Sequence, residues 1–541
     1  MILLGIDVGT TGVKALAFDT STGKHRIAHR SYDLFFPQPA HVEQSPGQIW
    51  DATKSAAAEV LATAGTRAEP ASVSISSQGG TLIPLDEEFK PLGNAVVWMD
   101  HRARALGGAL NKEFGKDFFY MKTGWPLTGC LPFIQIRWLK DERPGFFRKV
   151  SRFGFVGDYI AYKLSGKWIA DPSSASITML YNLRKGAWDD ELLEVAGIRE
   201  DQLPQVTDSG SCIGTVEPSV ASELGIQGRE IPISSGGHDQ YCASLGAGSL
   251  EEGDLLLSGG TAWVTLLTSE RPVFDTRSYL SPGRHVVRGR WGLMSSISGA
   301  GAGVNWLGGM LRGKMAAEEG EREFYRRIEA ESDRVPPGSE RLFFFPHFLG
   351  STAPTWETEA SAAIVGLGLH HRPAHIFRAL LEGIGFDILW NVETFRGLGA
   401  KVSSGSMIGG AAKSRIWPQI TSDIIGLPIR IPRIQEAACV GAAILGGLGA
   451  GVIRHYRRVL DLALSDSSLI EPDPARSQRY KDLFPSYRET FWKLRNARDN
   501  AATRTNTRLS QTVPRRGRRP SRPGRTSSRR PRRSGGKSPQ G

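Results

Sequence analysis

Near the start of the chain, an aspartate and the turn that follows it could together bind a phosphorylated ligand. Asp7 lies at the end of an apolar run, and the turn Gly9-Thr10-Thr11-Gly12 leads into a second apolar run. Glycines let backbone N–H groups approach an anion closely, and threonine hydroxyls add further donors. An acid beside such donors suits phosphate with Mg²⁺, which Asp7 would hold. The alternative is an ordinary turn in which Asp7 caps its own backbone, because short motifs have many false matches.

The same pattern occurs again about half a chain later. Residues 255–267 predict strand, turn and strand, with Gly260 and Thr261 in the turn, as residues 2–18 do around the first turn. Aliphatic and β-branched runs on both sides of a short glycine turn are typical of a β-hairpin. Two such hairpins indicate two related lobes, each presenting a phosphate-binding turn to a shared cleft.

A second acid follows another glycine turn. Residues 231–237 form a short β-rich run that ends in two glycines, and Asp239 and Gln240 then begin a helix rich in alanine and glycine. The helix dipole stabilises an acid at this position, which explains the aspartate but not the pattern around it. A base must lie within hydrogen-bond reach of the proton that it takes, and the neighbour of such a base points elsewhere. We therefore expect His238 to have a local structural role.

Polar residues also follow predicted strands in the first half of the chain. Gln78 comes after the strand at residues 71–76, and Trp98, Asp100 and Arg102 follow a later strand. Ligands of α/β sheets bind just beyond strand ends, so Trp98 could offer an apolar face to C–H groups, and the charged pair could bind hydroxyls. A structural salt bridge between Asp100 and Arg102 is an equally good interpretation.

Residues 407–414 predict a strand, a double-glycine turn and the start of a helix. Gly409 and Gly410 would let a flat adenine ring lie on the backbone, with Ser414 near its edge. The alternative is a plain turn from strand to helix. A second glycine-rich segment at residues 295–307 includes Gly299, but composition alone is weak support for a nucleotide site.

Several of these segments resemble the FGGY carbohydrate kinases, a family in the actin, hexokinase and heat-shock ATPase superfamily. The most specific match is to the family's second signature, at residues 362–382, and residues 130–142 resemble the first signature. Residues 231–240 resemble the family's Gly-x-x-Asp-Gln motif. The resemblance extends over about residues 2–495, which is most of the chain.

The resemblance implies roles for the site residues. Asp239 would be the catalytic base, since phosphoryl transfer to an alcohol needs a carboxylate that accepts the hydroxyl proton. ATP and Mg²⁺ are the implied cofactors, with Asp7 and Asp239 as the metal acids. The implied substrate-binding residues are Gln78, Trp98, Asp100, Arg102, Asp239 and Gln240. The implied nucleotide-binding residues are Gly9, Thr10, Thr11, Gly260, Thr261, Gly299, Gly409, Gly410 and Ser414.

The implied activity is ATP-dependent transfer of the γ-phosphate to a hydroxyl of a ketose, polyol or sugar acid, with a xylulose-like substrate as the first choice. Gln78-Gly79-Gly80 differs from the Gln-Arg-Glu of glycerol kinases and the Gln-Met-His-Gly of xylulokinases, so the substrate stays open. The alternative function is an actin-fold ATPase that acts as a binding or regulatory module without sugar kinase activity. The intact Asp239 disfavours it, because a module of that kind needs no base.

The resemblance also implies the fold class, α/β with two ribonuclease H-like lobes of the actin ATPase type, whose mixed sheets surround a central cleft. A length of 541 residues agrees with more than one domain. We expect an N-terminal lobe at residues 1–245 with the sugar side and the base, and a C-terminal lobe at 246–495 with the nucleotide side. Residues 496–541 should be a disordered Arg-rich tail, because its Arg, Pro, Ser and Gly cannot form a core.

The net charge of +12 comes from this tail. From residue 504 to the end there are thirteen Arg or Lys and no Asp or Glu, so the rest of the chain has a net charge of −1. We expect the tail to bind polyanions weakly, or to be a solvated and dispensable extension.

The cysteines and the apolar runs bear on localisation. Four widely spaced cysteines form no Cys-x-x-Cys pair, so a reducing cytoplasm is expected rather than a disulfide framework. The N-terminus has no pattern of a signal peptide. No apolar run reaches the ~20 residues of a membrane helix, so we expect no membrane partner. The expected partner is a small-molecule sugar or polyol, and a homodimer is kept as one assembly state.

Overall fold

The computed structural model divides the chain into two compact units, Met1–Tyr487 and Arg488–Gly541, and the site lies in the first. In the part of the chain that is described, no helix is both long enough and apolar enough to cross a membrane. Side chains are described up to residue 497. The described residues are 1–64, 70–226, 230–313 and 320–512.

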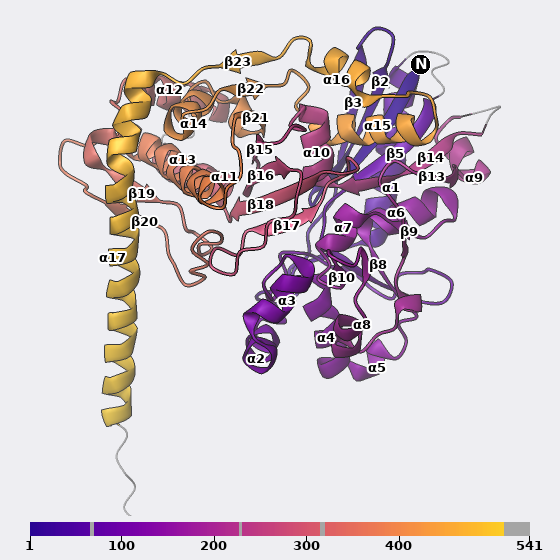
Figure 1. The fold of residues 1–541 in the computed structure, drawn as a ribbon, viewed down its shortest axis with the longest axis horizontal. Helices are drawn as coiled ribbons and strands as arrows, with labels where there is room; N and C mark the ends of the chain where they lie inside the picture. The colour runs from indigo at the N-terminus through magenta and orange to yellow at the C-terminus, as the bar shows by residue number, and fades with distance from the viewer. Residues whose placement is uncertain (65–69, 227–229, 314–319, 513–541) are drawn as a thin grey trace, which may run out of the picture. The chain divides into compact units, whose positions relative to one another are not determined.

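The first large sheet is mixed and has six strands (Figure 1). In spatial order the strands are β13 (Cys212–Thr215), β14 (Pro232–His238), β5 (Pro70–Ser77), β1 (Ile2–Val8), β2 (Gly12–Asp19) and β3 (His25–Ser31). β1 and β2 form the predicted antiparallel hairpin, and β3 extends it. On the other side, β5 runs parallel to β1, and β14 runs parallel to β5.

The second large sheet has seven strands and repeats this pattern. In spatial order the strands are β17 (Ser281–Arg284), β18 (Trp291–Ile297), β16 (Trp263–Ser269), β15 (Asp254–Gly259), β21 (Ser404–Gly409), β22 (Ile429–Ile431) and β23 (Ser468–Ile470). β15, β16 and β18 form an antiparallel meander, while β21 and β22 continue from β15 in parallel. The central pairings of β3-β2-β1-β5-β14 therefore recur in β18-β16-β15-β21-β22, as the two Gly-Thr turns predicted.

Smaller sheets complete the strand inventory. A four-stranded sheet contains β4 (Glu43–Gln44), β7 (Ala95–Val96), β6 (Leu82–Leu85) and β8 (Arg152–Phe155). Three two-stranded pairs are β9 (Ile169–Ala170) with β12 (Gln205–Val206), β10 (Tyr181–Asn182) with β11 (Ala187–Trp188), and β19 (Phe343–Phe345) with β20 (Ala363–Val365).

Helices lie between and around these strands (Figure 1). Those of the first half are α1 (Pro46–Thr63), α2 (Arg104–Phe114), α3 (Lys116–Thr123), α4 (Pro132–Glu142), α5 (Pro144–Phe147), α6 (Val156–Ser165), α7 (Pro172–Ser176), α8 (Asp190–Ala196), α9 (Pro218–Glu223) and α10 (Asp239–Ala247). Those of the second half are α11 (Ala300–Arg312), α12 (Glu321–Asp333), α13 (Pro373–Gly397), α14 (Trp417–Ile425), α15 (Ala437–Gly449), α16 (Tyr456–Leu464) and α17 (Pro474–Thr512).

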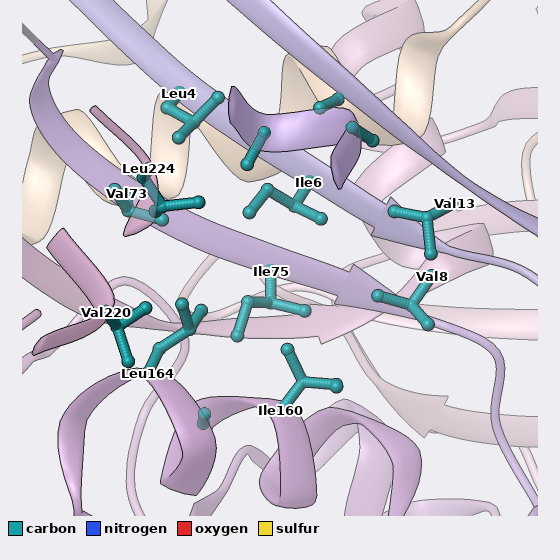
Figure 2. Close-up of a cluster of buried hydrophobic side chains, with 14 of the residues drawn as sticks. Leu4, Ile6, Val8, Val13, Val73, Ile75, Ile160, Leu164, Val220 and Leu224 are labelled. Carbon is teal, nitrogen blue, oxygen red and sulfur yellow. The ribbon is translucent and has the colours of Figure 1, made fainter. Parts of the chain in front are cut away.

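The core of the first sheet is built by alternating side chains. Figure 2 shows residues of β1, β2 and β5, among them Ile6, Val13 and Ile75, lying near Ile160 and Leu164 of α6. These side chains are almost fully buried, and each contributes roughly 1.5–3 kcal/mol on leaving water. This packing fixes the ends of β1 and β5, where the predicted site residues lie.

Helices α10 and α15 pack against each other through glycine. A Cβ atom on Gly246 would lie 1.9 Å from the Ala437 carbonyl oxygen, and one on Gly441 would lie 2.0 Å from that of Cys242. Both helices share one apolar cluster with Leu3 of the first sheet and with the second sheet's β15. α10 begins at Asp239, so this contact ties the predicted base to both sheets.

The predicted tail boundary at residue 496 is wrong. α17 continues to Thr512, so residues 496–512 are helical rather than disordered. The physical reason lies in the composition: residues 496–513 contain neither proline nor glycine, and the first helix-breaking proline is Pro514. The rest of the predicted tail, residues 513–541, lies outside the described residues.

Candidate active site

The predicted metal acid, Asp7, lies in a row of residues that crosses three strands. Asp7 is opposite Ser76 of β5, and Ser76 is opposite Gly237 of β14. The Ser76 hydroxyl donates a 2.8 Å hydrogen bond to Asp7 Oδ1. Because parallel strands end at the same edge, this register brings Asp7 close to the acid that follows β14, Asp239.

The first glycine-threonine turn is fixed from outside by three side chains. The Tyr32 hydroxyl donates to the Gly9 carbonyl oxygen, and the Gln44 amide donates to that of Thr10. The Trp98 indole N–H donates to Thr10 Oγ1 at 3.0 Å. The turn and the predicted sugar-side tryptophan are therefore one hydrogen-bonded unit.

Asp239 is the first residue of α10 and follows an irregularity in β14. The register against β5 shifts between Ser234 and Gly237, so the strand bulges just before the acid. At Gly236, a Cβ atom would lie 1.5 Å from the Ile75 carbonyl oxygen, so this close approach requires glycine. Beyond the bulge, the His238 N–H donates at 2.9 Å to the Ser173 hydroxyl.

Ser173 belongs to a short polar network around α7. Asp171 caps this helix, since its Oδ1 accepts from the backbone N–H groups of Ser173 and Ser174 and from the Ser173 hydroxyl. Ser173 thus joins a buried carboxylate to the backbone next to Asp239. Asp171 therefore serves as the N-cap of α7.

His238 also has the local role expected of it. Its Nδ1 accepts a 3.2 Å hydrogen bond from the Gln240 N–H and so caps α10. Burial lowers the pKa of His238 to about 4, so the ring is neutral at pH 7. Nδ1 also lies 3.2 Å from Asp239 Oδ1. The two do not form an ion pair, because the ring is neutral and Nδ1 already accepts the hydrogen bond from the Gln240 N–H.

Both acids of this edge hold their protons more tightly than an ordinary aspartate. Burial raises the pKa of Asp7 to about 6, and the charge of Asp239 adds to this rise. Burial also raises the pKa of Asp239 to about 6, against hydrogen bonds from Gln240 that lower it. A bound cation would stabilise the charged forms of these two neighbouring carboxylates. A carboxylate whose pKa is raised in this way can also accept a proton near neutral pH.

Two amides next to these acids have acceptors without a partner. The Gln78 amide donates to Gln44 Oε1 at 2.9 Å, while its own Oε1 has no hydrogen bond among the described residues. Gln240 Oε1 is buried and unpaired in the same way. A buried amide oxygen without a donor is unfavourable, so both oxygens are suited to hydroxyl groups of a ligand.

Asp100 and Arg102 form the salt bridge that was the alternative interpretation. Asp100 is fully buried, and its oxygens accept from the Arg102 guanidinium, at 2.8 and 2.9 Å, and from the Val42 N–H. Arg102 also pairs with Glu43 at 2.8 Å, and its side chain is only 9% exposed. In this arrangement Asp100 positions Arg102 rather than facing a ligand.

The predicted nucleotide residues of the second sheet converge. Gly259 and Gly409 are opposite each other at the ends of β15 and β21, so the Gly260–Thr261 turn lies beside the double-glycine turn. The Ala302 N–H donates to the Thr261 carbonyl oxygen at 3.1 Å, which brings the start of α11 and Gly299 to the same place.

Ser414 lies one turn beyond Gly410 and shortly before α14. Its hydroxyl accepts from the Trp417 N–H at 3.1 Å. The hydroxyl proton is still available for a ligand, since this contact uses the oxygen as an acceptor. The structure thus brings the predicted residues together in two groups, one at the edge of each sheet.

Two family models match the chain. The N-terminal domain of the FGGY family of carbohydrate kinases matches residues 2–246, and the C-terminal domain of the same family matches residues 255–450. The chain belongs to the FGGY family of carbohydrate kinases. It is therefore an ATP-dependent sugar kinase, and ATP is its phosphoryl donor.

Individual relatives agree with this family. A glycerol kinase of Thermus brockianus is 32% identical over 465 residues, which cover 83% of this chain and 90% of that protein. A gluconokinase of Bacillus licheniformis is 27% identical over 515 residues, covering 93% and 97%. The crystal structure of a xylulose kinase from Rhodospirillum rubrum matches with a TM-score of 0.82 at 26% identity, covering 92% and 99%. The predicted fold class, with two actin-type lobes, is confirmed.

Sequence reasoning missed several residues that build this kinase's first group. Tyr32, Gln44 and Ser76 each hold a predicted site residue, and Ser173 holds the His238 N–H beside Asp239. Ser76 has a weak signal, since it lies two residues before Gln78, near the end of the strand that Gln78 follows. The others come from distant segments, and nothing in their local sequence indicates the contact.

Proposed function

We propose that this FGGY kinase phosphorylates an uncharged ketose or polyol, with Asp239 as the base. The observation that carries the proposal is the edge of the first sheet, where two carboxyl groups with raised pKa values lie beside two unpaired amide oxygens. Hydroxyl groups of a sugar would donate to Gln78 Oε1 and Gln240 Oε1, and Trp98 would cover the C–H face.

Charge favours a neutral substrate over a sugar acid. Arg102 is the one cation among the six predicted substrate residues, and both Asp100 and Glu43 already neutralise it. A carboxylate substrate placed here would meet Asp7 and Asp239 without a free guanidinium to offset the repulsion. A ketose such as xylulose, or a polyol such as glycerol, brings no such charge.

In the proposed reaction, the substrate hydroxyl attacks the γ-phosphorus of ATP while Asp239 takes the hydroxyl proton. The bond from the γ-phosphorus to the bridging oxygen breaks, and ADP leaves. The backbone N–H groups of the two glycine-threonine turns would hold phosphate oxygens, and Gly409 with Gly410 would accommodate the adenosine. Gln240 would keep Asp239 oriented through the hydrogen bonds that lower its pKa.

The residues at this edge fit Mg²⁺. Asp7 and Asp239 are hard oxygen donors, and their mutual repulsion would be relieved by a divalent cation. When bound, Mg²⁺ neutralises charge on the phosphate oxygens. We propose Asp7 as its main protein anchor, with Asp239 near enough to contribute.

A substrate panel with ADP release as the readout tests this proposal. We expect activity with xylulose or glycerol, or with another neutral polyol, and only weak activity with gluconate. Faster turnover of gluconate than of every neutral substrate would overturn the charge argument. ATP hydrolysis that no sugar or polyol in the panel stimulates would favour the binding-module alternative.

A further inference from the structure

A basic hairpin tip lines a cavity that contains none of the residues assigned to the reaction. The tip is the turn at residues 284–290, between β17 and β18, and it carries Arg284, His285, Arg288 and Arg290. Together with Pro172, Asp208 and Ser209 it lines a cavity that is partly open to solvent. None of these residues has a role in the proposed reaction.

His285 is a buried hydrogen-bond donor without a partner. The side chain is 7% exposed, and its Nδ1 accepts from the Val287 N–H at 3.0 Å. Nε2 must therefore carry the proton in the neutral ring, and burial keeps the ring neutral by lowering its pKa to about 3. Among the described residues Nε2 has no acceptor, so this N–H is free for one.

The arginines place positive charge at the same end of the cavity. The Arg284 guanidinium stacks on the Trp291 ring at 4.0 Å and donates to the Leu183 carbonyl oxygen at 3.0 Å, which holds it in place. Arg290 is balanced by Glu270 and Glu251. Arg288 is exposed and forms no ion pair within the described part of the chain.

The lining residues outside the tip have a different chemistry. Asp208 is exposed, and Ser209 lies next to it with a hydroxyl that is only 3.4 Å from Asp171 Oδ1. A carboxylate and a hydroxyl accept hydrogen bonds from alcohol groups, and the carboxylate repels a second anion. A ligand that suits both sets of lining residues has an anionic group and hydroxyl groups.

We propose that this cavity binds a phosphorylated sugar or polyol at a site separate from the ATP–sugar cleft. The phosphate contacts Arg284, Arg288 and the His285 N–H, because guanidinium groups and N–H donors match phosphate oxygens. The hydroxyls of the same molecule contact Asp208 and Ser209. If the proposed function is correct, this ligand belongs to the chemical class of the kinase's own product.

The tip also packs directly against the strand that bears the predicted base. A Cβ atom on Gly237 would lie 2.3 Å from Val286 Cγ1, so Val286 fills the space that the glycine leaves. Gly237 is two residues before Asp239. A ligand that holds the tip therefore acts on the segment that positions the base, and bound phosphosugar should lower kcat.

Direct binding tests the site without relying on turnover. Glycerol 3-phosphate, inorganic phosphate and glycerol would each be titrated calorimetrically into the full-length protein, at fixed ionic strength and with a saturating non-hydrolysable ATP analogue. We expect glycerol 3-phosphate to bind more tightly than inorganic phosphate, and glycerol not to bind at the cavity. Arg288→Ala should weaken glycerol 3-phosphate by at least about tenfold, as expected for a lost charged hydrogen bond.

Arg148→Ala, which removes an exposed arginine elsewhere, is the matched control and should leave the affinity unchanged. His285→Gln tests the buried donor, with circular dichroism as the check on folding. Equal affinity of wild type and Arg288→Ala would overturn the proposal, as would inorganic phosphate binding as tightly as glycerol 3-phosphate. Because no catalysis is measured, these outcomes are independent of whether the proposed reaction is correct.

Discussion

Replacing Asp7 by asparagine should stabilise the protein at alkaline pH and leave its stability at acid pH unchanged. The pKa of this carboxyl rises from 3.8 to about 6 on folding, mainly because it is buried. Above pH 6 the group is ionised in both states, and burying its charge destabilises the folded protein. Well below pH 3.8 the group is protonated in both states, so this destabilisation disappears. The cost of the charge is therefore fully present at pH 8 and largely absent at pH 3.

The size of the stabilisation follows from the difference of about two pKa units between the folded and unfolded states. At 1.36 kcal/mol for each pKa unit, the upper bound on the gain in unfolding free energy is about 3 kcal/mol. Asp7 is partly exposed, so we reduce the expected gain to about 1–2 kcal/mol. Asparagine keeps an oxygen that can accept from the Ser76 hydroxyl, so the substitution should remove little besides the charge.

Thermal unfolding monitored by fluorescence at pH 8 and at pH 3, with a chelator present, would measure the effect. The gain at pH 8 should raise the apparent Tm by a few degrees, at one fixed scan rate. Asp19→Asn on the neighbouring strand is a control of opposite sign, because hydrogen bonds from Ser21 and Thr22 lower the pKa of Asp19. It should destabilise at pH 8, and an Asp7→Asn effect that is equal at both pH values would refute the reasoning.

Two further predictions concern positioning and the C-terminus. Ser173→Ala leaves the His238 N–H without its acceptor, so kcat per folded molecule should fall by about tenfold or more while ATP affinity is kept. Ser176→Ala, in the same helix, is the control, and equal losses in both variants would assign Ser173 a purely structural role. Deleting residues 513–541 should leave kinase activity unchanged and abolish salt-sensitive binding to polyanions such as heparin, and a large loss of activity would contradict the prediction.

Local patterns predicted those parts of the fold that local residues determine. Serine before proline is typical of a helix start, and α1 begins in this way, with Ser45 accepting from the Gln48 N–H and Pro46 as its first residue. The two glycine-threonine turns are hairpins because only short glycine turns connect such strands tightly. Asp239 begins a helix as predicted, since the glycines before it permit the bulge in β14.

Long-range contacts were beyond the reach of the sequence. Gln44 bonds Thr10 from 34 residues away in the sequence, and Ser173 bonds His238 from 65 residues away. Glutamine and serine bind many kinds of partner, so the residue type does not predict which one. The pattern around Asp100 and Arg102 allowed both a substrate pair and a salt bridge, because burial decides between them. α17 extends past the predicted start of the tail because residues 496–512 contain no proline or glycine that would end a helix.

The most direct test of the whole account is the turnover of Asp239→Asn. This substitution keeps the size of the side chain and removes the proton acceptor, so kcat should fall by roughly 10²-fold or more. ATP should still bind with wild-type affinity, measured by calorimetry, because the proposed adenosine and phosphate contacts lie in the glycine turns. Near-normal turnover with any substrate that the wild type uses would show that Asp239 is not the base.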